Sequence, residues 1–433
     1  PGIVWSVPER DDGVIGRMFE FGRDLRKLFA QARESDDLGW VELIGADLVR
    51  AEARQQSIDV GRVSCSHPFD AGLRSSALWR EHARRTGFGD SLERAGKAAS
   101  EAVRIAVGED QSARAAIETA HVLMLEFDLC GGVPRLERAV AGIDALGRVN
   151  RPETARAAAV IHARLKARQA RLSTDTTALL DAAALLDAAL HDLGPGPGPA
   201  ADEVRLDRAT LALEAGVARC DPRLLDQAGR DLRDLVEHAA PEYRPLTRAR
   251  ALSLCGLGMK LLAAMAGDTA VMRQGQAMFE AAADQFTVDH SPLDWVAIQV
   301  VRADDRSPLV ALAQAQALTE GGGLVLGALA REARCARETV AAEADGDLKT
   351  LSDLRVRLCG RLADRSHRQT PLDWAADQIA IARINLALGR LTGRDAAGLD
   401  MTLVEAAATA RELGVAVLAA RADALIAARA VRV

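Results

Sequence analysis

The residues best suited to covalent chemistry lie in the segment SCSHPFD, which contains Cys65, His67 and Asp70. A thiol, an imidazole and a carboxylate are the three groups of a nucleophile activated by an oriented base. Such a site needs the thiol and the imidazole about 3 Å apart, and residues two apart in an extended loop meet only by chance. We interpret the segment as a structured linker and expect a protein that is not an enzyme. An enzyme using Cys65 and His67 is the remote alternative.

Metal, cofactor and phosphate sites have weaker support. A structural zinc site needs four converging ligands, whereas the chain has six scattered cysteines, no CxxC pair and histidines without an i, i+4 partner. These histidines include His82, His121, His162, His191 and His238. The segment EGGGLVLG (Glu320–Gly327) leads into a helix start, where backbone N–H groups could hold a phosphate. It lacks the Lys and Ser/Thr of a P-loop, so we interpret it as a flexible turn and expect no metal and no cofactor.

Arginines form the strongest group of candidate binding residues, because a guanidinium can hold a carboxylate through two parallel hydrogen bonds. Three sets recur at steps of three and four residues, which places each set on one helix face. They are Arg164, Arg168 and Arg171; Arg331, Arg334 and Arg337; and Arg357, Arg361, Arg365 and Arg368. The functional interpretation is a docking surface for an acidic peptide or a C-terminus. The alternative is a solvated face whose arginines pair with neighbours such as Glu332 or Asp364.

Composition favours helices and argues against several classes of partner. The 433 residues are 49% hydrophobic but only 3% aromatic, so Ala, Leu, Val and Ile must build the core. A formal net charge of -6 provides no global field to attract nucleic acid or an anionic membrane. The N-terminus lacks the pattern of a secretory signal, and Lys260 interrupts the longest apolar stretch. We expect a soluble, cytoplasmic protein that binds neither nucleic acid nor membranes.

Prolines reveal a repeat. Pro152, Pro199, Pro245 and Pro292 are spaced by 47, 46 and 47 residues, and each stands where a helix pattern opens, the position that tolerates a missing N–H. The next start is due near Leu324, Pro371 lies 47 residues further on, and earlier starts fall near Gln111 and Pro68.

A second helix is expected within each unit, opened by Asp, Ser or Gly as the capping residue. These helices should start near Asp90, Pro134, Thr176, Pro222, Thr269, Pro308, Leu348 and Ala396. Paired helices at this period are typical of an α-solenoid. We therefore predict an all-α protein: an N-terminal helical cap over residues 1–66 and a solenoid of about eight hairpins over residues 67–433. A last helix should cap the C-terminal end.

The phrases SPLDW (Ser291–Trp295) and TPLDW (Thr370–Trp374) fall on this repeat grid. Ser291 and Thr370 are expected as N-caps, and Asp294 and Asp373 as the acidic partners of capping boxes. Each Trp should cover the junction with the preceding hairpin. The first PLDW helix should stop early at ADDRSP, so we expect a possible bend at residues 292–330.

The segment PLDWAADQIAIARINLALGRLTG (Pro371–Gly393) resembles the first helix of a bacterial tetratricopeptide-type repeat. Units of that type open with PLDWA, carry a Gln four residues after the Trp and close with Leu-Gly, as at Gln378, Leu388 and Gly389. Ala382 matches the small residue that lets paired helices approach. The resemblance implies a right-handed superhelix whose first helices form a concave face, a role in holding proteins together, and no catalytic residues.

These observations lead to one expected function and one alternative from another class. We expect a cytoplasmic scaffold or adaptor that binds a partner protein or an acidic peptide over an extended surface. The alternative is a regulatory protein that senses a small molecule or peptide by changing the curvature of its superhelix. The sequence leaves the oligomeric state open.

Overall fold

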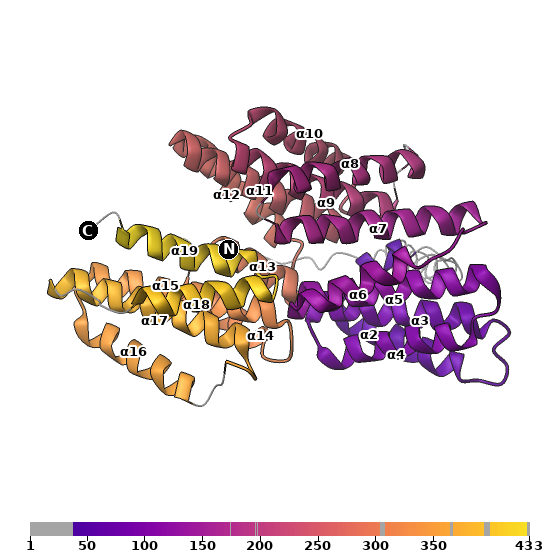
Figure 1. Ribbon diagram of the computed structural model, residues 1–433, viewed down its shortest axis with the longest axis horizontal. Coiled ribbons are helices and arrows are strands. Elements are labelled where there is room, and N and C mark those ends of the chain that lie inside the picture. Colours follow the sequence, from indigo (N-terminus) through magenta and orange to yellow (C-terminus); the bar gives the residue numbers. More distant parts are fainter. Residues whose placement is uncertain are drawn as a thin grey trace, which may run out of the picture.

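The computed structural model describes residues 38–173, 175–194, 196, 198–303, 308–363, 367–393 and 399–430. Over these ranges the chain forms eighteen α-helices, α2 to α19, one short 3-10 helix, η1, and no strand (Figure 1). The prediction of an all-α protein is confirmed. The first predicted cap helix, Arg365 and the expected helix start at Ala396 lie outside the described residues.

The helices follow the predicted order of hairpins. The first helices of the hairpins are α3 (Pro68–Thr86), α5 (Gly108–Cys130), α7 (Pro152–Leu172), α9 (Pro199–Arg219), α11 (Pro245–Ala266), α13 (Pro292–Val301), α15 (Leu324–Ala344) and α17 (Pro371–Thr392). The second helices are α4 (Gly89–Ile105), α6 (Val133–Asp144), α8 (Thr176–Leu193), α10 (Pro222–His238), α12 (Thr269–Ala283), α14 (Leu309–Leu318), α16 (Leu348–Ala363) and α18 (Leu399–Glu412). Flanking them are η1 (Gly39–Leu43), α2 (Ala46–Val60) and α19 (Ala416–Ala430).

Local sequence sets most of the helix starts. Pro152, Pro199, Pro245, Pro292 and Pro371 each begin a helix, as the proline spacing predicted. Helix α5 begins at Gly108, ahead of the predicted Gln111, because the Gln111 side chain reaches back and accepts a hydrogen bond from the Val107 N–H at 2.8 Å. The Asp caps of the second helices form as expected: the carboxylates of Asp175, Asp221 and Asp268 accept from backbone N–H groups of the first helical turn.

The capping boxes predicted for the two PLDW phrases are not formed. Neither Ser291 nor Thr370 makes a side-chain cap hydrogen bond. The Ser291 hydroxyl instead donates to the Asp294 carboxylate at 2.6 Å, and Asp294 is turned towards arginines on other helices. Tertiary ion pairs therefore outcompete the local cap for this carboxylate. Trp295 packs between the apolar cluster of α11 and α12 and that of α13 to α15, so the predicted covering role of this ring is confirmed.

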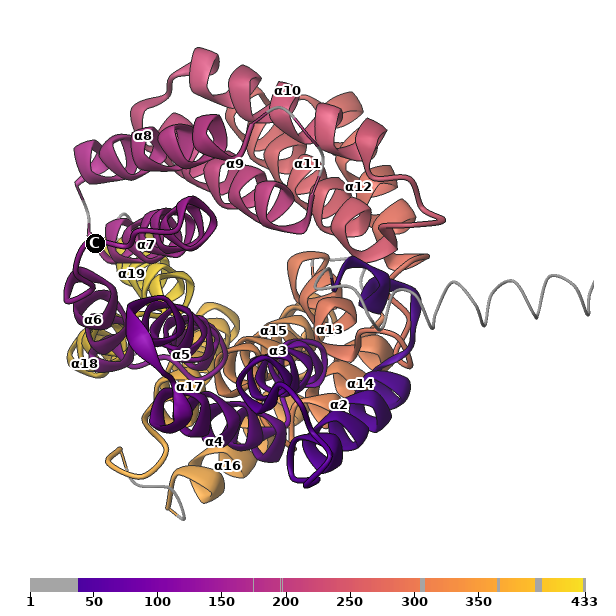
Figure 2. The same cartoon turned by 90° about the vertical axis from the view of Figure 1, so that its right-hand side faces the viewer.

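Each hairpin packs against the next through apolar side chains, mostly Leu and Ala. Leu225, Leu232 and Leu235 of α10 are buried against α9 and α11, and Leu179 and Leu186 of α8 are buried against α7 and α9. The first helices α3, α5, α7, α9 and α11 contact one another in sequence, and α13, α15 and α17 do the same. Figure 2 shows α8, α10 and α12 on the outside of α9 and α11, with the helices arranged around a central opening.

Hairpins that are five repeats apart lie against each other across the molecule. Helix α3 packs on α13, α5 packs on α15, and η1 packs on α11 (Figure 2). The Ala46 N–H donates to the Asp289 carbonyl at 3.1 Å, and the Gly132 N–H donates to the Leu413 carbonyl at 2.8 Å. These contacts join hairpins that are several repeats apart in the sequence, so the array closes on itself.

The glycine-rich segment before α15 is one of the closing contacts and not a free turn. Gly322 pairs with Phe88 in an isolated bridge, and a Cβ atom at Gly322 would lie 1.7 Å from the carbonyl oxygen of Gly87. Only glycine fits at that distance. The interpretation of this segment as a flexible turn is therefore wrong: the backbone of the α14–α15 turn lies directly on the α3–α4 turn.

Among the described residues, one helix, α11, is long and apolar enough by composition to cross a membrane. Its Leu246, Ala249 and Ala251 are buried against neighbouring helices, and the Lys260 ammonium donates to the Val301 carbonyl at 3.0 Å. About a third of its most apolar stretch is buried inside the molecule.

Candidate binding site

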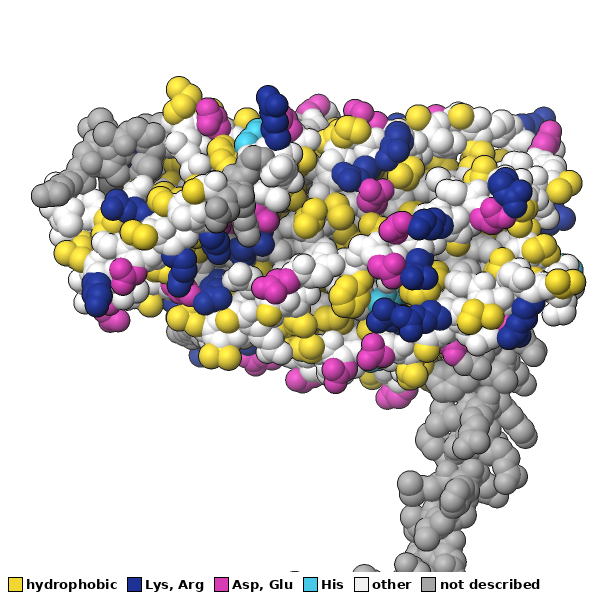
Figure 3. All heavy atoms as spheres, turned by 90° about the horizontal axis from the view of Figure 1, so that it is seen from below, with side chains coloured by type: hydrophobic (Ala, Val, Ile, Leu, Met, Phe, Trp, Pro, Cys, Tyr) yellow, Lys and Arg dark blue, Asp and Glu magenta, His cyan; other side chains and the backbone are white. Residues whose placement is uncertain are grey.

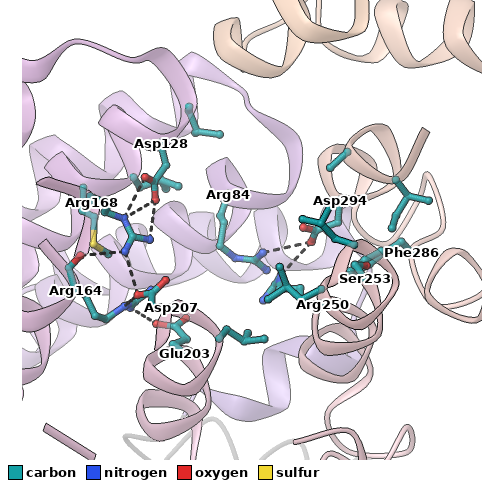
Figure 4. Close-up of a pocket in the computed structure, with 18 of the residues that line it drawn as sticks. Arg84, Asp128, Arg164, Arg168, Glu203, Asp207, Arg250, Ser253, Phe286 and Asp294 are labelled. Atoms are coloured by element: carbon teal, nitrogen blue, oxygen red, sulfur yellow. Dashed lines mark hydrogen bonds and ion pairs between the residues drawn. The ribbon is translucent and has the colours of Figure 1, made fainter. Parts of the chain in front are cut away.

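A cavity of ≈ 430 Å³ lies inside the closed array (Figure 4). Its wall comes from six first helices, α3, α5, α7, α9, α11 and α13, together with Phe279 of α12 and Phe286 just after it. Side chains that are far apart in the sequence meet here because the first helices lie side by side and α3 returns to α13. This volume is within the range of small-molecule sites.

Part of the wall is apolar. On one side it is formed by Leu254 and Leu257 of α11 and by Ile298 and Val301 of α13. Met124, Leu125 and Leu129 of α5 and Leu206 of α9 also line the cavity. Leu206, Leu254, Leu257 and Val301 are only partly buried, so apolar surface is left open to the cavity.

One charged cluster joins α5, α7 and α9. The Arg168 guanidinium donates to both carboxylate oxygens of Asp128 at 3.0–3.1 Å and to Asp207 at 3.0 Å. Arg164 donates to the same Asp207 oxygen at 2.8 Å and to Glu203. Burial acts to raise the pKa of Asp207, but Arg168 and Arg164 more than offset this and hold the pKa below its ordinary value.

A second charged cluster joins α3, α11 and α13 (Figure 4). Asp294 of the SPLDW phrase accepts from Arg84 at 3.3 Å and from Arg250 at 3.0 Å. The other guanidinium nitrogens of Arg84 hold Glu81 at 2.6–2.7 Å. Burial raises the pKa of Asp294, while Arg84 and the Ser291 hydroxyl act in the opposite direction. Arg84 and Asp294 thus link the beginning of the array to its sixth hairpin.

The predicted arginine sets have two kinds of environment. Arg164 and Arg168 line the cavity and are held by the carboxylates described above. Arg171, on the same face of α7, pairs with Glu214 of α9 at 2.7 Å but keeps 45% of its side chain exposed. The fold therefore places Arg164 and Arg168 in the wall of the cavity, whereas Arg171 is more accessible to solvent.

The second set lies on α15, and the third set lies on α16 and in the segment that follows it. Arg331 pairs with Asp373 of the TPLDW phrase, Arg334 and Arg357 both pair with Glu338, and Arg361 pairs with Asp377 at 2.7 Å. Arg337 is half-buried and Arg368 is exposed. Most of these guanidinium groups hold carboxylates of the same or a neighbouring hairpin, and Arg357, Arg361 and Arg368 do not share the cavity with the α7 set.

Cys65, His67 and Asp70 are not assembled as a catalytic group in the structure. Asp70 pairs with Arg114 of α5 at 2.8 Å, and His67 is an exposed residue at the start of α3. No group of three or more His, Cys, Asp or Glu side chains in the described ranges could hold a metal ion.

On the face in Figure 3, basic and acidic side chains are interspersed.

Several cavity residues were missed by the sequence reasoning. Arg80 and Arg84 are a single i, i+4 pair and Arg250 has no arginine three or four residues away, so neither helix shows a three-membered stripe; His121 gave no signal because it has no histidine partner. The repeated phrase SPLDW drew attention to Asp294, but its position predicted a helix-capping role and not the observed pairing with Arg84 and Arg250. Only the meeting of separate helices reveals these residues as one site.

Comparison with known proteins adds no relative. No family model matches the chain, and no curated protein matches it.

Proposed function

We propose that the protein is a non-catalytic scaffold or adaptor of the tetratricopeptide-like class, a right-handed α-solenoid that holds a segment of a partner protein on the extended surface of its hairpins. The observation that carries this proposal is the joint wall built by six first helices. A surface made by many short units can contact a partner over a long path without any unit being a catalytic centre.

The accessible arginines are the proposed partner contacts. Arg164 and Arg168 are fully engaged with carboxylates and serve the architecture. Arg171 at 45% exposure and Arg357 at 58% exposure can exchange their present carboxylates for those of an acidic partner at little cost, because exposed ion pairs contribute little. Arg368 is also exposed. A cytoplasmic location is part of this proposal, and the six free cysteines support it.

A charge-swap experiment tests the proposal. The double variant Arg171→Glu/Glu214→Arg retains an ion pair between α7 and α9 but inverts the charges that a partner meets. The matched control is Arg104→Glu/Glu101→Arg, which swaps an exposed pair on the outer helix α4. Full-length chains are immobilised and proteins retained from an extract of the source cells are quantified. We expect one stoichiometric protein on the unmodified and control chains, and at least a fivefold loss on the Arg171 swap. Equal retention by both swaps, or no stoichiometric protein, would contradict the proposal.

A further inference from the structure

The central cavity has a chemical character that the scaffold function does not require. Its charged groups are paired with one another, whereas part of its apolar surface is not covered by other side chains. The five arginines of the wall, Arg80, Arg84, Arg164, Arg168 and Arg250, each have a carboxylate partner. The four carboxylates of the wall, Asp128, Glu203, Asp207 and Asp294, each have an arginine.

This charge balance argues against a charged ligand. With Glu81, Glu118 and the Arg85 that also pairs with Glu81 included, the cluster has six carboxylates for six guanidinium groups. A ligand anion or cation would have to displace one partner of an ion pair whose guanidinium group is at most 25% exposed, and the charge left behind would lose its compensation. An uncharged ligand avoids this cost.

The apolar wall provides the favourable contribution. Leu254 and Leu257 of α11 and Ile298 and Val301 of α13 line the same side of the cavity. Covering such surface stabilises a complex in proportion to the area removed from water. Ala297, between Asp294 and Val301 on α13, also lines the cavity and leaves room beside these side chains.

One polar group of the wall has no partner. His121 of α5 lines the cavity, and no hydrogen bond of the described residues involves its ring nitrogens; Nδ1 is sealed from solvent. Burial, followed by the charges of Arg80 and Arg164, lowers the pKa of His121 well below its usual value. The ring is therefore neutral at pH 7 and is free to form a hydrogen bond with a ligand.

From these four observations we propose that the cavity is a binding site for a small uncharged molecule with an apolar body and one hydrogen-bonding group. The apolar body lies against α11 and α13, and the polar group meets His121. The site goes beyond the proposed scaffold function, since binding of such a molecule needs no partner protein.

Two matched fluorescent probes test the proposal on the purified full-length chain. N-phenylnaphthylamine is uncharged, has fused aromatic rings and carries one N–H group; anilinonaphthalene sulfonate has the same rings with an added sulfonate. We expect saturable binding of the uncharged probe at one site per chain and binding of the sulfonate about tenfold weaker or more, because the sulfonate meets only paired charges. Equal or tighter binding of the sulfonate would overturn the proposal.

Variants locate the site. Ala297→Trp fills the cavity and should abolish the binding of N-phenylnaphthylamine, whereas Ala264→Trp, at an exposed position of α11, should leave it unchanged. His121→Phe keeps an aromatic ring at this position but removes the nitrogens, and should weaken binding about fivefold, the effect of one hydrogen bond. Binding that survives Ala297→Trp would place the probe elsewhere and refute the site. Circular dichroism of each variant confirms that the helices are retained.

The outcome is independent of the scaffold test. Loss of a partner protein in the Arg171→Glu/Glu214→Arg variant with normal probe binding would support both proposals. Absence of probe binding with a retained partner would refute the cavity ligand alone.

Discussion

At the scale of single residues, His82 is held neutral inside the first hairpin. Its side chain is buried, its Nδ1 is 2.8 Å from the Ser91 hydroxyl, and its ring stacks on Phe88 with centroids 6.0 Å apart. Burial, helped by the charge of Arg50, lowers the pKa of His82 to about 4. Proton uptake by this ring is therefore coupled to unfolding.

The protein should lose stability when the pH falls from neutral. The pKa of His82 is lower in the folded chain, about 4, than the ordinary 6.5 of an unfolded chain. The stabilising contribution of its neutral form is complete above pH 6.5 and is lost as the pH falls towards 4. Between pH 7 and pH 5 this group alone should remove about 2 kcal/mol from the free energy of unfolding. Urea unfolding at the two pH values measures the loss.

The variant His82→Gln isolates this contribution. It should be less stable at pH 7 but should lose about 2 kcal/mol less than the unmodified chain between pH 7 and pH 5. His238→Gln, at an exposed position of α10, serves as the control and should keep the full pH dependence. An identical pH dependence in the His82 variant would show that another group is responsible.

At the scale of elements, ion pairs repeat with the period of the hairpins. Arg164–Asp207, Arg171–Glu214 and Arg250–Asp294 join residues 43, 43 and 44 apart, in each case from one first helix to the next. A pair of this kind opposes sliding of one helix along its neighbour, because a shift of one turn separates the charges. The arginine stripe of α7 thus holds α7 in register with α9.

Small residues set how closely two helices of a hairpin approach. Gly256 of α11 and Gly275 of α12 face one another: a Cβ at Gly256 would lie 2.9 Å from the Gly275 carbonyl oxygen and 3.1 Å from the Phe279 ring. Backbone atoms cannot move aside as a flexible side chain can. Glycine is therefore required at this contact for packing.

Replacement of Gly256 by Ala should destabilise the protein by about 2 kcal/mol, the usual cost of overpacking a tight contact. The control is Gly229→Ala in α10, where no atom lies within 4 Å of the added Cβ. That change should stabilise by up to about 1 kcal/mol, because Ala favours the helix more than Gly does. Chemical denaturation compares the two. A gain of stability in both variants would contradict the packing role of Gly256.

At the scale of the whole molecule, the decisive feature is closure of the array. The turn before α15 lies on the turn after α3, Arg84 meets Asp294, and the Glu42 carboxylate accepts hydrogen bonds from the Thr247 N–H and from Arg244. These contacts involve short backbone approaches and buried polar groups. The cavity exists because of them, since its wall includes both α3 and α13.

Gly322→Ala should weaken the closure. The added Cβ would overlap the Gly87 carbonyl oxygen, at 1.7 Å, so the two turns must separate. The Ala46 N–H, which donates to Asp289 across the closure, should exchange with deuterium at least about tenfold faster, equivalent to about 1.4 kcal/mol in the opening free energy. The radius of gyration from solution X-ray scattering should also increase.

Gly346→Ala is the matched control for that experiment. Gly346 has a positive φ of 67°, but no atom lies within 4 Å of a Cβ there, so only the local backbone is strained. Exchange at Ala46 should be unchanged in this variant. Equal exchange rates in both variants would mean that the contact between the turns does not hold the array closed.

The helices and most of their starting residues could be predicted from local patterns in the sequence. Proline at the first helical position, Asp before the second helices and apolar residues at helical spacing act within a few residues, so Pro152, Asp175 or Leu225 report local structure wherever they occur. A repeat also predicts that neighbouring hairpins pack alike, which is why the all-α fold could be read from the spacing of five prolines.

The contacts between hairpins that are distant in the sequence, such as α3 with α13, could be seen only in the folded molecule. The curvature per hairpin is a small rotation that accumulates over the repeats, and no local pattern encodes where the chain returns to itself. For that reason Gly322 was interpreted as part of a flexible turn, Asp294 as a cap, and Arg84, His121 and Arg250 were not selected at all. Each of these residues contacts a residue that is distant in the sequence, and the cavity forms where their helices pack together.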